Sequence, residues 1–385
     1  MYKFSLSSML VIASCSLCGL FAQDGVDKRL SDLEKEMKDI YGENASGTKG
    51  ALFAPGRNVD AEGNWYADIE ALLWHVKSGA TDWAIVFDQS LPPSDGNMKT
   101  LGFDWDWGLR VGIGKYLEHD NWDAGMLYTY YRTADSSKVL VGFSTPTGTD
   151  GPVGSPGPSG TTNGNFSAKV SLNSIDVALG KSYFTSKDIM VHPHIGIKNV
   201  WIIEKYRLNT DNYINATGTF VPVSGNVSTS LEDTNKLWGI GPHVGVDFSW
   251  DLCGNFKFVS TAEGALLQGY FQVKQEEEIF VAPVGDTAVS TTINLKGNMH
   301  QFVPFGRLLL GLGWGDHCNN NKQYIDLSLN YEVNYFWREN QMINEVNSDP
   351  SAVSLSSSDS VRLLLTRLSE DIGFYGVTFR VKLDF

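Results

Sequence analysis

The stretch that decides the fold is Trp238–Trp250, with the sequence WGIGPHVGVDFSW. Its bulky apolar residues fall at every second position, and glycine, His243, Asp247 and Ser249 fill the positions between them. Because successive side chains of a strand point to opposite faces, this pattern predicts a β-strand with one apolar face and one small, polar face. Twelve residue steps give ~40 Å of strand, which at a tilt of ~40–45° is a height of ~28–30 Å. This height matches a membrane with a tryptophan at each water interface.

The same alternation recurs along the chain and predicts ten strands. They lie at 65–76, 103–116, 122–132, 166–184, 189–206, 237–250, 255–273, 299–314, 323–337 and 374–385. A soluble β-sandwich also alternates, but soluble strands centre on about 5–6 residues, and most of these are at least twice as long. A transmembrane strand needs ~9–11 residues to cross the hydrocarbon. The strand lengths therefore favour a membrane protein.

The connections between these strands alternate between long and short. The long ones lie near 77–102, 133–165, 207–236, 274–298 and 338–373, and the short ones at 117–121, 185–188, 251–254 and 315–322. Long loops on one side and tight turns on the other are typical of outer-membrane barrels. We therefore expect an all-β fold, a closed antiparallel transmembrane β-barrel of ten strands. Lys138–Phe143 and Thr291–Lys296 could add strands, so 10–16 strands stay open.

The N-terminal region has a different composition from the barrel. Residues 1–22 are predicted to be a signal peptide for export, with an uncleaved helical anchor or a lipoprotein modified at Cys15 as alternatives. Apolar residues at helical spacing among charges predict a short amphipathic, coiled-coil-like helix in the periplasm over 23–44, and 45–63 reads as a linker. The barrel occupies 64–385. The net charge of −14 and pI of 4.9 exclude a typical nucleic-acid-binding protein.

Several segments of the barrel resemble a known family. They are Trp65–Trp74 (WYADIEALLW), Gly108–Gly114 (GLRVGIG), His194–Lys198 with Val200–Ile202, Leu237–Pro242 (LWGIGP) and Asp371–Arg380 (DIGFYGVTFR). In this order they resemble the major outer membrane protein family of Legionella and chlamydia-like bacteria, over about 64–385. The resemblance implies an abundant porin or porin-like protein of the Gram-negative cell surface. It transfers no catalytic residues.

The inward face of the predicted barrel carries both acids and bases, with eight acids to five bases. The pore-lining candidates are Asp68, Glu70, Asp104, Asp106, Arg110, Asp176, Lys198, His243, Asp247, Arg307, Asp326, Glu332, Arg380 and Lys382. Such a mixture suits a water-filled lumen, and an excess of acids favours cations. Asp104 and Asp106 are expected to contribute to this preference. Ten strands would leave only a narrow pore, because eight are already filled by side chains.

Other chemistry-bearing residues give weaker signals. His192 and His194 point the same way on a strand, but the sequence identifies no third ligand, so we expect lumen or rim histidines and no metal. No catalytic group or cofactor site is expected, and the chain is not predicted to be an enzyme. Cys253 and Cys318 both lie in predicted periplasmic turns, where export permits a disulfide between them or to neighbours. The terminal Phe385 resembles the signal read by the outer-membrane assembly machinery.

Two functions remain open from the sequence. The first is a porin that forms a water-filled channel for small hydrophilic solutes and ions. The second is a surface-exposed structural protein or adhesin, in which the barrel anchors long extracellular loops. The expected partners are outer-membrane lipids, the assembly machinery, further copies in a homo-oligomer, and small solutes or ions, with no nucleic acid.

Overall fold

The computed structural model describes residues 65–87, 96–117, 122–144, 161–186, 188–215, 224–283, 287–318, 323–347 and 363–385. The predicted signal peptide (1–22), amphipathic helix (23–44) and linker (45–63) lie outside the described residues. In the part of the chain that is described, no helix combines the length and apolar character needed to cross a membrane.

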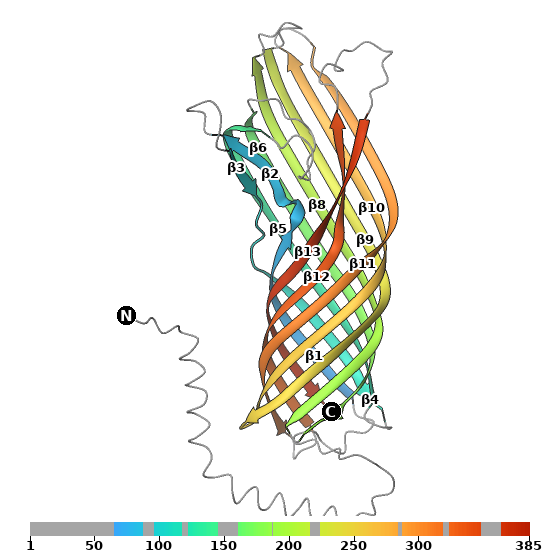
Figure 1. Ribbon diagram of the computed structural model, residues 1–385. Helices are drawn as coiled ribbons and strands as arrows, with labels where there is room; N and C mark the ends of the chain where they lie inside the picture. The colour runs from blue at the N-terminus through green and yellow to red at the C-terminus, as the bar shows by residue number, and fades with distance from the viewer. Residues whose placement is uncertain are drawn as a thin grey trace, which may run out of the picture.

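The described residues form one antiparallel sheet with a single short 3₁₀ turn, η1 (Gly79–Thr81). The strands are β1 (Trp65–Ser78), β2 (Asp82–Phe87), β3 (Gly96–Thr100), β4 (Asp106–Tyr116), β5 (Trp122–Ser144), β6 (Thr161–Lys181), β7 (Tyr183–Phe184), β8 (Ile189–Asn215), β9 (Ser224–Cys253), β10 (Phe256–Pro283), β11 (Val289–Cys318), β12 (Gln323–Asn347) and β13 (Leu363–Asp384). Ten of them close a tilted barrel in the order β1-β4-β5-β6-β8-β9-β10-β11-β12-β13 (Figure 1). The ten-stranded closed barrel is confirmed.

The barrel closes between its first and last strands. β13 pairs with β1 from Tyr66↔Asp384 to Ser78↔Ile372. At the lower end, the Trp65 N–H donates to the Phe385 carbonyl at 2.9 Å, and the Phe385 N–H donates to the Trp65 carbonyl at 2.8 Å. This satisfies the backbone groups that an open sheet edge would leave unpaired in lipid. Both ends of the barrel segment thus lie on the side of the tight turns, as expected.

The strands are much longer than the alternation predicted. β8 to β11 have 27 to 30 residues each, or ~90–100 Å of strand, which is more than twice what the hydrocarbon requires. Most of the predicted long loops are therefore strand, which corrects that expectation. Lys138–Phe143 continues β5 and Thr291–Lys296 continues β11, so neither adds a strand to the ring.

A band of outward-facing apolar side chains marks the membrane-spanning part of the barrel. Ile195 and Ile197 of β8 are each 57% exposed, as expected for lipid-facing residues. We call the outward-facing tryptophans at the upper edge of this band the girdle; they are Trp107, Trp201, Trp238 and Trp337. Trp201 and Trp238 lie opposite each other in the β8–β9 register. The membrane-spanning part extends from the girdle down to the tight turns.

The polarity of the two faces inverts above the girdle. On β8, outward-facing isoleucines below it give way to the exposed Lys205 and Arg207 above it. The inward positions change the other way, from Lys198 to Ile202 and Leu208, which are buried. Water replaces lipid around the upper wall, so apolar side chains gather inside, as in a soluble protein. The chain thus joins a membrane barrel to an extramembrane part with its own apolar core.

Above the girdle, on the side away from the tight turns, the strands form an upper wall that is no longer a closed ring. The β11–β12 pairing runs only up to Phe305↔Phe336, and the β1–β13 pairing up to Ser78↔Ile372. The upper ends of β12 and β13 continue together as a hairpin, while β8 to β11 rise furthest as a curved sheet (Figure 1). The β2–β3 hairpin joins this wall through two residue pairs with β5.

Candidate functional site

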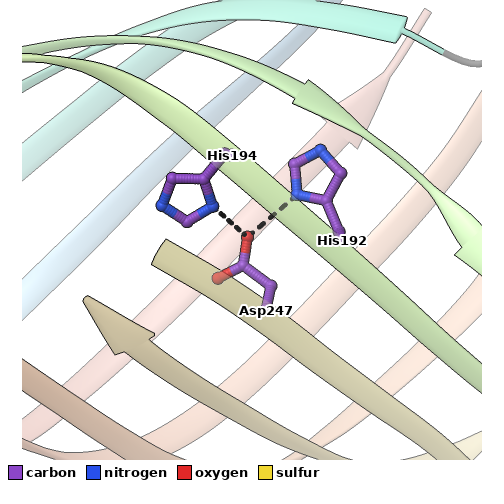
Figure 2. A group of neighbouring side chains, drawn as sticks. All are labelled: His192, His194 and Asp247. Carbon is purple, nitrogen blue, oxygen red and sulfur yellow. Dashed lines mark hydrogen bonds and ion pairs between the residues drawn. The ribbon is translucent and has the colours of Figure 1, made fainter. Parts of the chain in front are cut away.

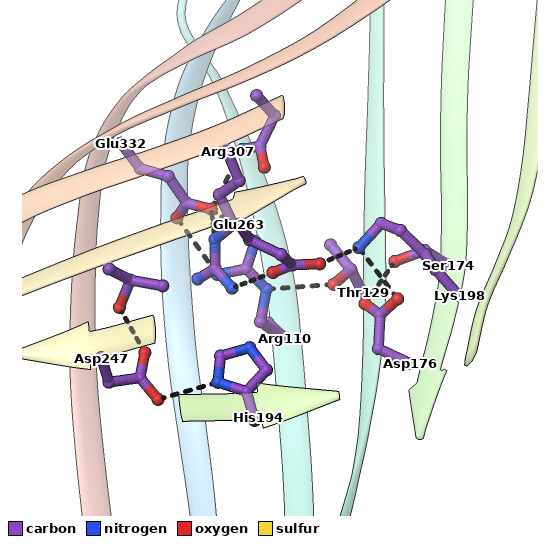
Figure 3. A network of polar contacts seen from close by, with 12 residues as sticks. Arg110, Thr129, Ser174, Asp176, His194, Lys198, Asp247, Glu263, Arg307 and Glu332 are labelled. Atoms are coloured by element: carbon purple, nitrogen blue, oxygen red, sulfur yellow. Dashed lines mark hydrogen bonds and ion pairs between the residues drawn. The ribbon is translucent and has the colours of Figure 1, made fainter. Parts of the chain in front are cut away.

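Most of the predicted lumen residues meet in one network of ion pairs inside the membrane-spanning part. Acids and bases alternate along it, and we call it the charge chain. Its members, in order of contact, are Asp176, Lys198, Glu263, Arg307, Glu332, Arg110, Glu70, Arg380 and Asp68. Figure 3 shows its central part, with side chains from several strands directed toward one another.

Glu332 of β12 is the centre of the charge chain and is fully buried. Its carboxylate accepts a hydrogen bond from Arg110 Nη2 at 2.8 Å and one from Arg307 Nε at 2.7 Å. Thr378 Oγ1 and Asn334 Nδ2 donate to the same carboxylate at 2.9 and 3.0 Å. A buried carboxylate is tolerated only when paired and hydrogen-bonded, and this one has two cations and two neutral donors.

Two arms extend from this centre. On one side, Arg307 contacts Glu263 at 3.6 Å, and Lys198 Nζ lies between Glu263 at 3.3 Å and Asp176 at 2.8 Å. On the other, Arg110 Nη1 bonds Glu70 at 2.6 Å, and Arg380 lies beyond it. Five acids face four bases, so the charge chain is nearly neutral. The charges expected to line a pore are therefore largely satisfied by one another.

Aromatic side chains close the lumen directly above the charge chain. We call them the apolar belt, which consists of Trp74, Tyr131, Phe305, Phe336 and Phe374. Their rings touch in series across the barrel, with centroid separations of 4.7 to 6.2 Å. The two layers are in contact, because Arg110 lies 5.3 Å from the centroid of Trp74 and Lys198 lies 4.4 Å from that of Phe305.

A polar chamber occupies the lumen below the charge chain. It is a cavity of about 270 Å³ whose lining includes His192, His194, Asp123 and Asp247. A second cavity, at the level of the tight turns, shares Tyr116, Asp326 and Lys382 with it. The two cavities therefore adjoin one another at the end of the barrel that carries the tight turns.

The other predicted pore residues lie outside the charge chain. Asp247, Asp326, Lys382 and His243 line the chamber. Asp106 lies near the girdle and accepts a hydrogen bond from Thr133 at 2.5 Å, and Asp104 is exposed in the segment before β4.

Sequence reasoning missed several charged lumen residues, including Glu263, Lys257 and Asp123. Glu263 faces inward on β10. It lies an even number of residues from the inward-facing Lys257 and Thr261, and this alternation is the sequence signal that could have identified it. Lys257 pairs with Asp326, and Asp123 follows the interfacial Trp122 at the start of β5.

Of the disulfides that the sequence permits, the one between Cys253 and Cys318 is not formed. Cys318 ends β11 as an exposed free thiol. β9 and β10 pair directly across the turn at Gly254 and Asn255, both of which have positive φ, as a two-residue hairpin turn requires. The alternative of a link from Cys318 to a neighbouring molecule is tested by thiol labelling.

Comparison with known proteins places the chain among outer-membrane proteins. Residues 59–385 match the profile of the family described as "Legionella pneumophila major outer membrane protein precursor". No curated protein matches the chain. Similar solved structures include the outer membrane protease OmpT from Escherichia coli, at 12% identity and a TM-score of 0.32, covering 84% of this chain and 96% of that one. They also include a Pseudomonas aeruginosa FadL homologue (9%, TM-score 0.25, 84% and 90%) and the Pseudomonas putida toluene transporter TodX (8%, TM-score 0.21, 84% and 89%).

Proposed function

Because the chain belongs to the family of the Legionella pneumophila major outer membrane protein, and is an outer-membrane β-barrel, we propose that it is exported by its signal peptide and serves as a surface-exposed structural protein or adhesin. In this role the barrel anchors the tall extramembrane wall formed by the upper parts of β5, β6 and β8 to β13. The observation that carries the proposal is the apolar belt, whose five rings fill the lumen above the charge chain.

The belt argues against a permanently open pore for hydrophilic solutes. Trp74, Tyr131, Phe336 and Phe374 are at most 1% exposed, so water does not reach them. A hydrated ion that crosses this layer would lose its water without gaining polar partners, at a high cost in free energy. Above the belt the extramembrane part has its own buried apolar residues, such as Ile202 and Leu208, so the lumen does not reopen directly above the belt.

Planar-bilayer recording of the purified, refolded barrel tests the proposal. Wild-type protein is expected to give no steady single-channel current. The triple variant Trp74→Ala, Phe336→Ala, Phe374→Ala removes rings from the belt and is expected to conduct. A matched control carries alanine at the lipid-facing Phe302 and Phe379 and is expected to stay silent. Steady currents from the wild-type protein would overturn the proposal.

The second candidate function is a porin-like channel for small ions and hydrophilic solutes. The observation that favours it is the polar chamber below the charge chain, together with the adjoining cavity at the tight turns. An anchor does not require such a chamber. Conduction through it would require the apolar belt to part, and wild-type currents in the bilayer experiment would decide for this function.

Display at the surface has its own test. Lys169 and Lys205 face outward above the girdle, opposite each other in the β6–β8 register, and both are exposed. A membrane-impermeant amine reagent applied to whole cells is expected to modify both. It should leave Lys257, in the lower lumen, unmodified until the cells are opened.

A further inference from the structure

Two histidines and one aspartate in the chamber direct ligand atoms to a common point. His192 and His194 are two residues apart on β8, and Asp247 lies opposite His192 in the β8–β9 register. Asp247 Oδ2 lies 3.0 Å from His192 Nδ1 and 3.4 Å from His194 Nδ1. Figure 2 shows both rings converging on this one oxygen. Asp247 is thus the third donor that the sequence alone did not identify.

These separations suit a shared metal ion. Metal–ligand bonds of ~2.0–2.1 Å at angles between 90° and 109° place two donor atoms about 2.9–3.4 Å apart. All three donor atoms lie within 4.8 Å of one another. Two imidazoles and one carboxylate are a donor set that borderline divalent transition metals prefer.

A second layer of hydrogen bonds orients two of these donors. The other ring nitrogen of His192, Nε2, lies 2.6 Å from Asp123 Oδ1, and Tyr66 donates to the second oxygen of Asp123 at 3.0 Å. Thr261 Oγ1 donates to Asp247 Oδ1 at 2.7 Å, which leaves Oδ2 directed at the histidines. Metal-binding histidines almost always have such a partner on the distal nitrogen, because it fixes the ring and its tautomer.

Two glycines make room for the rings. A Cβ at Gly180 would overlap His192 Nε2, and a Cβ at Gly245 would overlap His194 Nε2. The three donors also line the chamber, which adjoins the cavity at the tight-turn end of the barrel. The site thus has prepared space beside a polar cavity.

A second group of donors in the lumen does not offer the same site. Asp176, His243 and Glu263 also come together, but Lys198 Nζ lies 2.8 Å from Asp176 and 3.3 Å from Glu263. An ammonium group already supplies the positive charge there. At the first group, Asp123 and Asp247 bring two negative charges, which a divalent ion would balance.

We propose that the chamber holds a site for a divalent transition metal of the zinc class, bound by His192 Nδ1, His194 Nδ1 and Asp247 Oδ2. The metal takes the place of the hydrogen bond between His192 and Asp247, and the hydrogen bond from His192 to Asp123 remains. Three protein ligands leave at least one position to water or to a small ligand from the periplasm.

Zinc titration of the purified, folded barrel tests the site. The full barrel is stripped with chelator, and Zn²⁺ binding is followed by calorimetry and by competition with a chromophoric chelator. One Zn²⁺ per chain is expected. His194→Gln and Asp247→Asn each remove a ligand and should weaken binding by about 100-fold or more, and Asp123→Asn should weaken it by roughly 10–100-fold. His300→Gln is the matched control, because His300 is exposed and packs against Tyr270 away from the chamber.

Two further measurements keep the test decisive if a variant folds poorly. Heat-modifiable gel mobility shows which variants form the barrel, and Gly245→Ala tests the site without removing a ligand, since it displaces the His194 ring. Co²⁺ bound to the wild-type protein should give visible absorption bands that Gly245→Ala weakens. The proposal is overturned if wild-type protein binds no stoichiometric Zn²⁺, or if folded His194→Gln and Asp247→Asn bind it as tightly as His300→Gln does. Either result would assign these side chains to a hydrogen-bond network alone.

Discussion

A buried carboxyl just above the girdle makes the stability of the protein depend on pH. Glu204 of β8 is fully buried, and its carboxyl accepts hydrogen bonds from Tyr206 Oη at 3.0 Å and from Asn235 Nδ2 at 3.2 Å. Burial raises the pKa of Glu204 from 4.5 to about 7. Burial and the neighbouring Glu204 hold the pKa of Glu339 well above its ordinary value.

The sign and size of the effect follow from this pKa. In the unfolded chain Glu204 ionises near pH 4.5, so between pH 4.5 and 7 the folded protein binds more protons than the unfolded chain. The contribution of Glu204 to the free energy of unfolding is therefore largest below pH 4.5. It falls as the pH rises from 4.5 through 7. A pKa raised from 4.5 to about 7 corresponds to a loss on the order of 3 kcal/mol once Glu204 is ionised. Glu204→Gln should abolish most of this loss.

Denaturant unfolding in detergent micelles, followed by tryptophan fluorescence at pH 5 and pH 8, measures the difference. Between these two conditions wild-type protein should lose about 2.5 kcal/mol more than Glu204→Gln does, because the unfolded carboxyl is already partly ionised at pH 5. Glu232→Gln is the matched control, because Glu232 lies at a similar height on β9 but faces outward and pairs with Arg207, which lowers its pKa. It should keep the wild-type pH dependence. An identical pH dependence in wild type and Glu204→Gln would refute the reasoning.

Three further outcomes are expected. Glu332→Gln leaves two buried guanidinium groups short of their shared carboxylate and should lower the free energy of unfolding by about 3–5 kcal/mol. Asp316→Asn, at an exposed position near the end of β11, should change it little, and equal effects would contradict the role of the charge chain. Deleting Phe385 removes the backbone pair with Trp65 and should lower the outer-membrane yield without lowering synthesis, and unchanged yield with unchanged heat-modifiable mobility would show that the residue is dispensable. Cys318 should react with a maleimide in isolated outer membranes without reductant, and failure to label it would indicate that it is bridged to a neighbour.

The fold of the membrane-spanning part could be predicted from the sequence because lipid imposes a simple rule. Every second residue of a strand such as Trp238–Trp250 must be apolar, and the opposite face is free to be polar. Above the girdle the rule changes phase, as between Ile197 and Ile202 of β8, which face opposite sides. A search for strands with apolar residues on the outward face loses its pattern above the girdle. The predicted strand therefore ended at 206, whereas β8 continues to Asn215.

The lumen was predicted in composition but not in arrangement. Whether a residue faces inward follows from the alternation within its own strand, and Glu332 and Arg110 were identified as inward-facing in this way. Their contact depends on which strands meet across the lumen, because the two residues are 222 positions apart in the chain. The same applies to Asp247, which reaches His192 only through the β8–β9 register.

The charge chain also acts as a check on strand alignment. Its nine residues come from β1, β4, β6, β8, β10, β11, β12 and β13, so eight of the ten barrel strands each contribute a charge to the same layer. A strand that inserted two residues out of step would keep its apolar face toward lipid, and alternation alone would not penalise it. The slip would, however, move its charge by ~6.6 Å, which exceeds the reach of an ion pair, and would leave the opposite charge buried without a partner. A misaligned barrel would thus keep its apolar surface toward lipid and still be destabilised by unpaired charges in its lumen. The charge chain therefore favours one strand stagger, or shear, among those that keep the apolar surface toward lipid.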